Sequence, residues 1–239
     1  MIGVIGGNGV AATARLASLV ENKVTLAGAF RDAHHPQIIF WQATKAPSRS
    51  MFLEGRGKSF IPDYVEIGKK LKQCGCTTLC MCCNTAHFAV DTLEEQIGLP
   101  FINLLKEVAI KCNALQVKRV GMMCSDGLRK TLLYDKYFLE NCKDATLIYP
   151  NEDMQNLVTK GICNAKNSVR ENLQSEEHPF KLFSEVCNHL VEQEVDCIVG
   201  GCTDISAVFS PPMYKNVVYV DSLDVLADAI LERAKDRDY

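Results

Sequence analysis

The sequence has no long apolar stretch and no excess of one charge. In its 239 residues, no apolar run approaches the roughly 20 residues that a membrane-spanning helix needs. Lys and Arg total 26 against 29 for Asp and Glu, whereas non-specific nucleic-acid binding usually depends on a clustered basic excess. The first residues, MIGVIGGNG, indicate a buried strand entering a glycine loop and not a signal peptide. We therefore expect a cytoplasmic protein with no membrane or nucleic-acid partner.

The sequence also lacks the cysteine spacings of a disulfide framework or a metal site, although it has 12 cysteines. Five of them are close together: Cys74, Cys76, Cys80, Cys82 and Cys83. No second Cys-x-x-Cys pair at the spacing of a zinc knuckle follows them, and Cys80 and Cys82 alternate along a predicted strand. We therefore expect no metal, and we expect most of the cysteines to be small buried hydrophobic residues.

What the sequence does have is an alternation of short apolar runs with helical periodicity, which is typical of an α/β protein with parallel strands. Strands are predicted at 1–5, 37–41, 77–82, 119–123, 145–149, 197–200 and 217–220. Apolar residues at helical spacing predict helices around 64–71, 180–190 and 223–230. Two segments, 43–62 and 164–175, are predicted to be loops.

A weak internal repeat divides the chain into two halves. A strand followed by Asn-Gly at 2–9 returns as a strand followed by Asp-Gly at 120–127, an offset of 118 residues. Later in each half a predicted strand runs into a cysteine, Cys83 in the first and Cys202 in the second. Ligands of open parallel sheets bind at the carboxyl ends of the strands, and clefts between domains are favoured pocket positions. The repeat therefore predicts two pseudo-symmetric lobes with one site between them.

The glycine loop after the first strand matches part of a dinucleotide fingerprint, Gly7-x-Gly9-x-x-Ala12. That fingerprint also needs an acidic residue near the end of the second strand, which holds the ribose. The nearest candidate, Asp32, precedes the second predicted strand. The loop is therefore interpreted as a tight strand-to-helix turn or another kind of anion site, and not as a dinucleotide site.

The two strand-end cysteines carry the clearest chemical signal. Cys83 is followed by Asn and Thr, and Cys202 by Thr and Asp. A cysteine at a helix start lies near backbone amides that favour its thiolate, and short polar side chains beside it suit a carboxylate ligand. Two such sulfurs on opposite faces of a carbon can invert it, if one is a thiolate and the other a thiol. The alternative is a pair of buried strand-end thiols without a catalytic role.

The motifs Met-Cys-Cys-Asn-Thr-Ala-His at 81–87 and Gly-Gly-Cys-Thr-Asp at 200–204 resemble the two signature motifs of the aspartate/glutamate racemase family. The Asn-Thr-Ala-His ending and the acidic residue after Cys-Thr resemble its aspartate racemase branch. Pro-Ser-Arg at 47–49 and Val-Asp-Ser at 220–222 extend the resemblance along the chain. It implies an α/β fold of two flavodoxin-like lobes, 1–105 plus 207–239 and 106–206. It further implies a homodimer and a cofactor-independent two-base racemase acting on an acidic amino acid, with aspartate favoured.

The resemblance also implies roles for individual residues. Cys83 and Cys202 match the two catalytic cysteines of the family. Arg49 matches an arginine that holds a substrate carboxylate, a role that suits the guanidinium fork. The predicted substrate-binding residues are Asn8, Arg49, Asn84, Thr85, Ser125, Thr203 and Asp204.

The sequence departs from the family pattern at several positions. It has Asn-Gly-Val at 8–10 where Met-Gly-Pro is common, and Leu128 where a second Thr is common. Some members use a lysine in aspartate recognition, and here Cys163 lies closer to its place than Lys160 or Lys166. These departures bear on the predicted identity of the substrate more than on the predicted type of reaction.

Other interpretations stay open at this point. The chain could be a related cysteine-dependent racemase or isomerase, such as a hydantoin racemase, or a non-catalytic protein that binds a small acid. Aspartate and glutamate are not distinguished. His87, one helical turn after Cys83, could touch a substrate, but the favoured interpretation is a hydrogen-bonded histidine beside a helix start.

Overall fold

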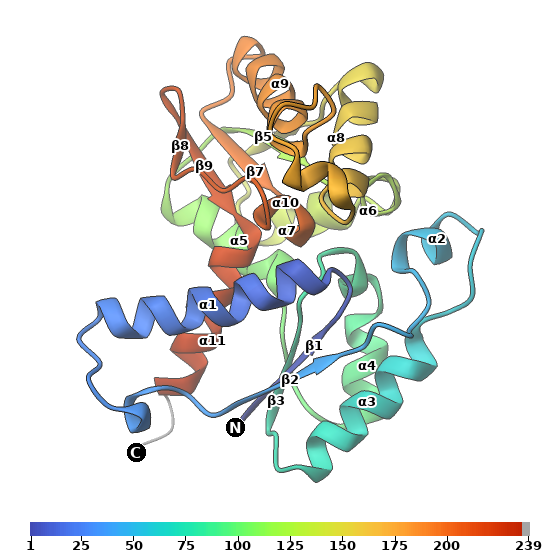
Figure 1. Cartoon of the computed structure of the whole chain (residues 1–239), viewed down its shortest axis with the longest axis vertical. Helices are drawn as coiled ribbons and strands as arrows, with labels where there is room; N and C mark the ends of the chain where they lie inside the picture. The colour runs from blue at the N-terminus through green and yellow to red at the C-terminus, as the bar shows by residue number, and fades with distance from the viewer. Residues whose placement is uncertain (236–239) are drawn as a thin grey trace.

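The computed structural model describes residues 1–235 and has two lobes, each built on its own sheet (Figure 1). The first sheet has the strand order β2-β1-β3-β4, with β1 at Ile2–Gly6, β2 at Ile38–Gln42, β3 at Thr78–Met81 and β4 at Phe101–Ile102. The second has the order β6-β5-β7-β9-β8, with β5 at Arg119–Met123, β6 at Thr146–Ile148, β7 at Cys197–Gly200, β8 at Met213–Tyr214 and β9 at Val217–Asp221.

The two sheets repeat one topology, which confirms the predicted α/β fold and its pseudo-symmetry. In each lobe the first strand in chain order lies between the second and the third, and a further strand, β4 in the first lobe and β9 in the second, lies beyond the third. All these strands pair in parallel, and only the edge pair β8–β9 is antiparallel. All seven predicted strands occur. The two that were missed, β4 and β8, have two residues each and are too short to show a periodic pattern.

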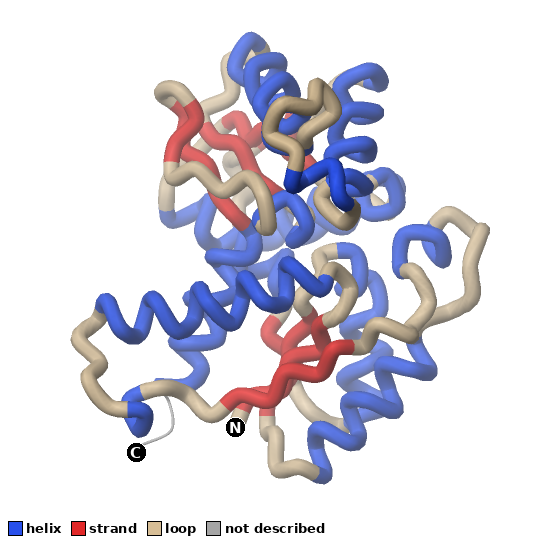
Figure 2. The backbone as a smooth tube through the Cα atoms, in the orientation of Figure 1, coloured by secondary structure: helices blue, strands red, loops and turns tan. Residues whose placement is uncertain are grey.

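Helices cover the sheets and join the lobes (Figure 2). The longer ones are α1 at Val10–Leu26, α3 at Ile61–Gln73, α4 at Val90–Ile97, α5 at Leu104–Ala114, α7 at Leu133–Asn141, α8 at Glu152–Asn164, α9 at Pro179–Glu192 and α11 at Ser222–Lys235. The short ones are α2 at Arg49–Leu53, α6 at Asp126–Lys130 and α10 at Thr203–Ser206, with 3-10 turns η1 at Asp32–His34, η2 at Thr85–Ala89 and η3 at Ser168–Glu171. The predicted loops 43–62 and 164–175 therefore contain α2 and η3.

The segment 207–239 does not belong to one lobe, which corrects the predicted boundary. Its strand β9 pairs in parallel with β7, with Gly200 opposite Asp221, and therefore completes the second sheet. In the second sheet β9 therefore holds the position beside β7 that β4 holds beside β3 in the first sheet. Helix α11 then leaves the second sheet and packs against α1 and α5. Residues 236–239 of the assigned range lie outside the described residues.

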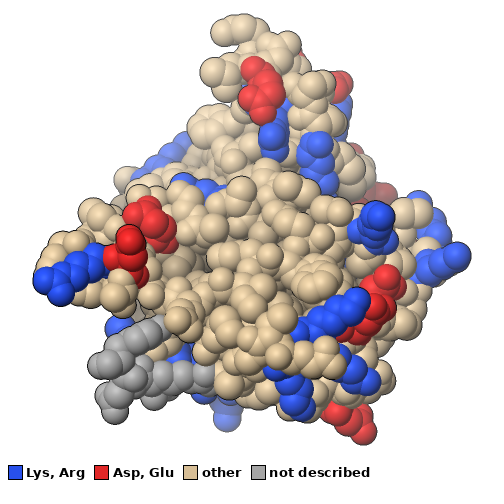
Figure 3. Space-filling model, turned by 60° about the horizontal axis from the view of Figure 1, so that its bottom comes forward, with Lys and Arg blue, Asp and Glu red and all other residues tan. Residues whose placement is uncertain are grey.

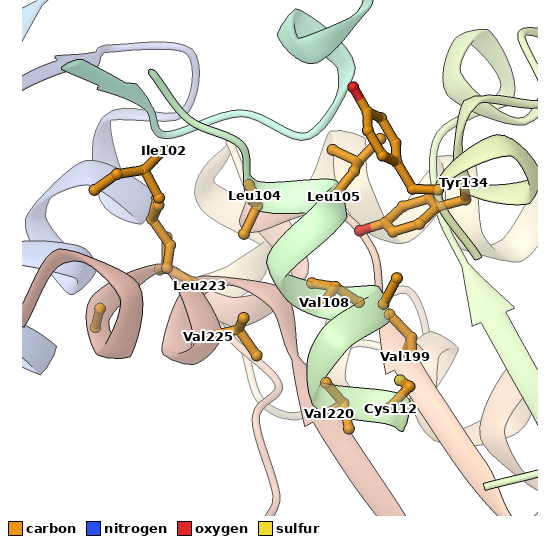
Figure 4. Close-up of a cluster of buried hydrophobic side chains, with 14 of the residues drawn as sticks. Ile102, Leu104, Leu105, Val108, Cys112, Tyr134, Val199, Val220, Leu223 and Val225 are labelled. Atoms are coloured by element: carbon orange, nitrogen blue, oxygen red, sulfur yellow. The ribbon is translucent and has the colours of Figure 1, made fainter. Parts of the chain in front are cut away.

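A shared hydrophobic core joins the lobes. Helix α5 contributes Leu104, Leu105, Val108 and Cys112, which lie beside the side chains of α11 and of the second sheet (Figure 4). The same cluster continues into the first sheet through alternate residues of β1 and β3, among them Val4 and Cys80. Both faces of these central strands are covered, which explains their continuous apolar runs.

Charged residues of both signs are mixed on the molecular surface. On the face shown in Figure 3, small groups of Lys and Arg alternate with groups of Asp and Glu around an uncharged centre. Within residues 1–235, none of the helices has both the length and the hydrophobicity to cross a bilayer.

Candidate active site

The carboxyl ends of β3 and β7 meet where the lobes face each other. Cys83 follows β3 and Cys202 follows β7, the strands next to the point where the chain order of each sheet reverses, which is where ligands of such sheets bind. The hydroxyl of Thr203 donates to the carbonyl of Cys82 across the junction at 3.3 Å. Thr85 and Ser125 share a second cross-lobe hydrogen bond of 3.1 Å. The lobes therefore hold the two cysteine motifs against each other.

Cys83 is half-buried and has a cationic neighbour. The guanidinium of Arg49, at the start of α2, lies near the Cys83 side chain. It also donates to the carbonyl oxygens of Pro47 at 2.9 Å and Asn8 at 3.2 Å. Burial disfavours the Arg49 charge, but the attraction of Cys83 outweighs this effect and raises the pKa of Arg49. A thiolate at Cys83 would therefore face a permanent positive charge.

Cys202 has the opposite surroundings. Its side chain is only 9% exposed at the start of α10, and its sulfur lies 4.0 Å from a carboxylate oxygen of Asp204. Burial raises the pKa of Cys202 strongly, and the charge of Asp204 raises it further. These surroundings favour the neutral thiol.

Lys166, which was not assigned from the sequence, reaches the site from the end of α8. Its Nζ forms an ion pair of 2.8 Å with the buried carboxylate of Asp204. Burial raises the pKa of Asp204, although Lys166 opposes the shift. Cys163, by contrast, is exposed, and Lys160 pairs at the surface with Glu177. The cation that pairs with Asp204 is therefore Lys166, which lies in the segment that had been predicted to be a loop.

A cavity of about 480 Å³ opens between the loop after β1 and the end of α8. Its lining includes Asn8, Gly9, Lys166, Arg170 and Asp204. A Cβ atom on Gly9 would lie 2.0 Å from Asp204 Oδ1, so only glycine allows this close approach of the lobes. The cavity has the size of a small-molecule site.

The glycine loop itself is a tight turn, as the sequence suggested. Gly7 has a φ of +79°, and its N–H donates to the hydroxyl of Thr13 at 2.9 Å. The same hydroxyl donates to the carbonyl of Gly9 at 3.1 Å. The turn therefore closes on the first helix and directs Asn8 and Gly9 toward the cavity.

Asn84 lies at the site, but its side chain is engaged within the protein. Its amide nitrogen donates to the hydroxyl of Ser222 at 3.1 Å, and its amide oxygen accepts from the hydroxyl of Tyr134 at 2.6 Å. Tyr134 and Ser222 start from the second lobe and from α11, and neither was predicted at the site. The Asn84 side chain therefore ties the lobes together.

His87 is a hydrogen-bonded buried histidine, which confirms the favoured interpretation. Its Nδ1 bonds the carbonyl of Cys83 at 2.9 Å, and the N–H of Leu104 donates to its Nε2 at 3.0 Å. This pattern requires a neutral ring with its proton on Nδ1. Burial lowers the pKa of His87 to about 4. His87 therefore fixes the backbone of Cys83 and is uncharged at neutral pH.

The lowered pKa of His87 predicts that the protein loses stability on acidification. An unfolded histidine binds a proton near pH 6.5, whereas folded His87 does so only near pH 4. Between these values the unfolded state holds more protons, so the free energy of unfolding should fall by up to about 3 kcal/mol as the pH drops from 7 to 4. Urea unfolding of the wild type and His87→Gln across this range measures the effect. The difference between the two proteins should change with pH, and a constant difference would contradict the assignment.

The other cysteines are interior side chains for the most part. Cys80 and Cys82 are fully buried, and all 12 cysteines are free thiols. In residues 1–235, no three His, Cys, Asp or Glu side chains gather as a metal-binding group.

The structure brings all nine predicted site residues to the junction of the lobes, whereas their roles toward a substrate stay predictions.

Comparison with known proteins agrees with this arrangement. The family model described as Asp/Glu/Hydantoin racemase matches residues 2–230. The broad specificity amino-acid racemase RacX of Bacillus subtilis is 22% identical over 231 residues, which cover 95% of both chains. The fold is similar to that of the Picrophilus torridus aspartate racemase, with a TM-score of 0.81, 21% identity and coverage of 98% of this chain and 94% of that one.

A glutamate racemase of Bacillus anthracis has the same fold, with a TM-score of 0.67 and 16% identity over 99% of this chain and 82% of the other. The family match extends over nearly the whole chain, through both lobes and both cysteine motifs. The chain therefore belongs to the Asp/Glu/hydantoin racemase family and is an isomerase of the amino-acid racemase type.

Proposed function

We propose that the protein inverts the α-carbon of an acidic amino acid, with aspartate favoured, by using Cys83 and Cys202 as its two acid–base groups and no cofactor. One observation carries the proposal: the two cysteines follow equivalent strands of the two lobes, and the Thr203–Cys82 hydrogen bond holds these strand ends together. A base and an acid on opposite faces of the substrate's α-carbon are what inversion without a cofactor requires.

In one direction the Cys83 thiolate takes the α-proton, and the electrons of the broken C–H bond pass into the substrate's α-carboxylate. The Cys202 thiol then gives its proton to the opposite face of the carbon. The enzyme is left with a thiol at Cys83 and a thiolate at Cys202, which is the state that runs the reverse reaction. The cation beside Cys83 and the burial of Cys202 support this choice of starting state.

The charges near the two cysteines support an acidic substrate. Arg49 lies near Cys83, and Lys166 pairs with Asp204, the neighbour of Cys202. Two cations suit the two carboxylates of aspartate or glutamate, and Asp204 suits the substrate's ammonium group. On binding, a substrate carboxylate would compete with Asp204 for Lys166.

The named relatives support the same substrate class and define the alternatives. One is an aspartate racemase and another a broad specificity amino-acid racemase, so other amino acids have to be tested. The family also includes hydantoin racemases, so a hydantoin is one alternative substrate. A second alternative is a non-catalytic protein that binds a small acid, which would need the cations but not the two thiols. We further propose a cytoplasmic location, since 12 free thiols suit a reducing compartment. A homodimer is proposed on the family resemblance.

A chiral assay of the purified protein tests this function. After dialysis against EDTA, it should interconvert L- and D-aspartate, act on glutamate more slowly, and leave alanine, lysine and a substituted hydantoin largely unchanged. Two thiols need no metal, so chelation should have no effect. If the protein turns over only the hydantoin or only lysine, its substrate is not an acidic amino acid and the proposed substrate class is wrong. Activity that is lost on chelation and restored by zinc would contradict the thiol mechanism.

A further inference from the structure

Buried polar atoms without a hydrogen-bond partner gather at one place in this protein. In the part of the chain that the structure describes, five such side-chain atoms occur: both amide atoms of Asn8, Nε of Arg49 and the hydroxyl oxygens of Tyr64 and Tyr219. All but the last belong to three neighbouring residues. Since buried polar groups in folded proteins nearly always have partners, such a concentration needs an explanation.

Tyr64 is the unexpected member of this group. Its spacing along α3 indicates a core position, and its ring packs edge-on against Phe60 with 5.0 Å between the centroids. That packing accounts for an aromatic ring but not for a hydroxyl group, because phenylalanine would make the same contact. The hydroxyl lies close to the Asn8 amide and to Arg49 and Cys83. Burial raises the pKa of Tyr64 far above its usual value, so the group remains a neutral donor.

The hydrogen-bonding groups of this cluster suit an anion. The Asn8 amide offers two N–H donors and an oxygen acceptor, the Tyr64 hydroxyl can donate and accept, and Arg49 Nε can only donate. The hydroxyl and the amide oxygen can pair with each other, which leaves N–H groups of Asn8 and Arg49 as donors beside the positive charge of Arg49. Donors around a cation suit an anion with acceptor oxygens, and a carboxylate fits.

We infer that Tyr64 is a positioning residue for the carboxylate that binds at Arg49. When a carboxylate binds beside Cys83, the Tyr64 hydroxyl donates to Oδ1 of Asn8 and so directs the Asn8 N–H groups toward that carboxylate, next to Arg49 Nε. The guanidinium is already joined to the Asn8 backbone by the 3.2 Å bond from Nη2, so the three residues act as one unit. The inference deepens the proposed function: that proposal supplies the substrate's identity, whereas the unpaired donors alone predict the anion.

The test uses Tyr64→Phe with malonate, a dicarboxylate that cannot be racemised. Without ligand the variant should be at least as stable as the wild type, because it loses an unpaired buried hydroxyl. Its malonate dissociation constant should rise about tenfold, and the malonate-induced increase in Tm should shrink accordingly. With aspartate, KM should rise about tenfold while kcat stays within about twofold, because Tyr64 acts on carboxylate binding and does not touch the reacting carbon.

Tyr219→Phe is the matched control. It also removes an unpaired buried hydroxyl, but one inside the second lobe beside Gly200 and Cys187. It should keep the wild-type affinity for malonate. A second variant, Asn8→Asp, preserves the shape of the side chain and places a negative charge in the group, so it should abolish stabilisation by malonate.

The outcomes separate this inference from the proposed function. Unchanged malonate affinity and unchanged KM in Tyr64→Phe would overturn the inference even if the wild type racemises aspartate. A wild type that malonate does not stabilise, or a Tyr64→Phe protein that is less stable without ligand, would also overturn it. If malonate binding depends on Tyr64 but no amino acid is racemised, the inference holds and the proposed function fails.

Discussion

Replacing either Cys83 or Cys202 with serine is expected to lower the rate of racemisation by about 10²- to 10⁴-fold, the usual contribution of a general acid or base. A serine hydroxyl is too weakly acidic to supply the same proton and too rarely ionised to remove one. Both directions of the reaction should be affected in each variant, since each cysteine is the base in one direction and the acid in the other. The rates are measured with purified variants and both enantiomers of aspartate.

Two controls distinguish this loss from damage to the fold. Cys163→Ser changes an exposed thiol on α8 and should keep the wild-type rate. Cys82→Ser changes the fully buried neighbour of Cys83. The Cys82 side chain packs in the hydrophobic core that joins the lobes, so this variant should keep near-normal turnover if it folds. If the Cys82→Ser protein folds but is inactive, the base has been assigned to the wrong one of the two neighbouring cysteines.

Arg49→Ala is expected to have the second-largest effect. It removes the cation beside Cys83 and the fork for a substrate carboxylate, so kcat/KM should fall by the equivalent of about 2–5 kcal/mol, the scale for truncating one partner of a buried charged pair. Arg49→Lys should recover only part of this loss, because an ammonium cannot form two parallel hydrogen bonds.

Arg56→Ala is the control for this variant. It removes an exposed arginine from the same segment, where it pairs with Glu54, and it should leave kcat/KM unchanged. Thermal unfolding of both variants separates catalysis from stability, because Arg49 also bonds the carbonyl groups of Pro47 and Asn8. If kcat/KM in Arg49→Ala equals the wild-type value, the arginine is only a structural part of its loop.

The fold could be predicted from the sequence because its central strands are buried on both faces. Such strands appear as continuous apolar runs, and all seven of the predicted runs form strands. The lobe boundary could not be predicted in the same way. Strand Val217–Asp221 belongs to the second sheet because it pairs with β7. The paired residues are about 20 positions apart, so the local sequence of the strand does not indicate which sheet it joins.

The site was predictable only where a chemical motif follows a strand. The cysteine motifs have this property, and the structure brings them together. Lys166 lies in a polar segment without periodicity, and Tyr64 matches the core periodicity of its helix, so nothing in the sequence separates either residue from its neighbours. The engagement of Asn84 by Tyr134 joins residues 50 positions apart and depends entirely on how the lobes pack.

The central claim is that the two sulfurs act on opposite faces of one carbon, and hydrogen exchange in D₂O tests it most directly. Each serine variant keeps one sulfur, which can still remove the α-hydrogen of one enantiomer and return a deuteron to the same face without inversion. Deuterium incorporation into L- and D-aspartate is measured by mass spectrometry for Cys83→Ser and Cys202→Ser. We predict that the two variants exchange opposite enantiomers while neither racemises them. Exchange of the same enantiomer by both variants, or full racemisation by either, would contradict the account.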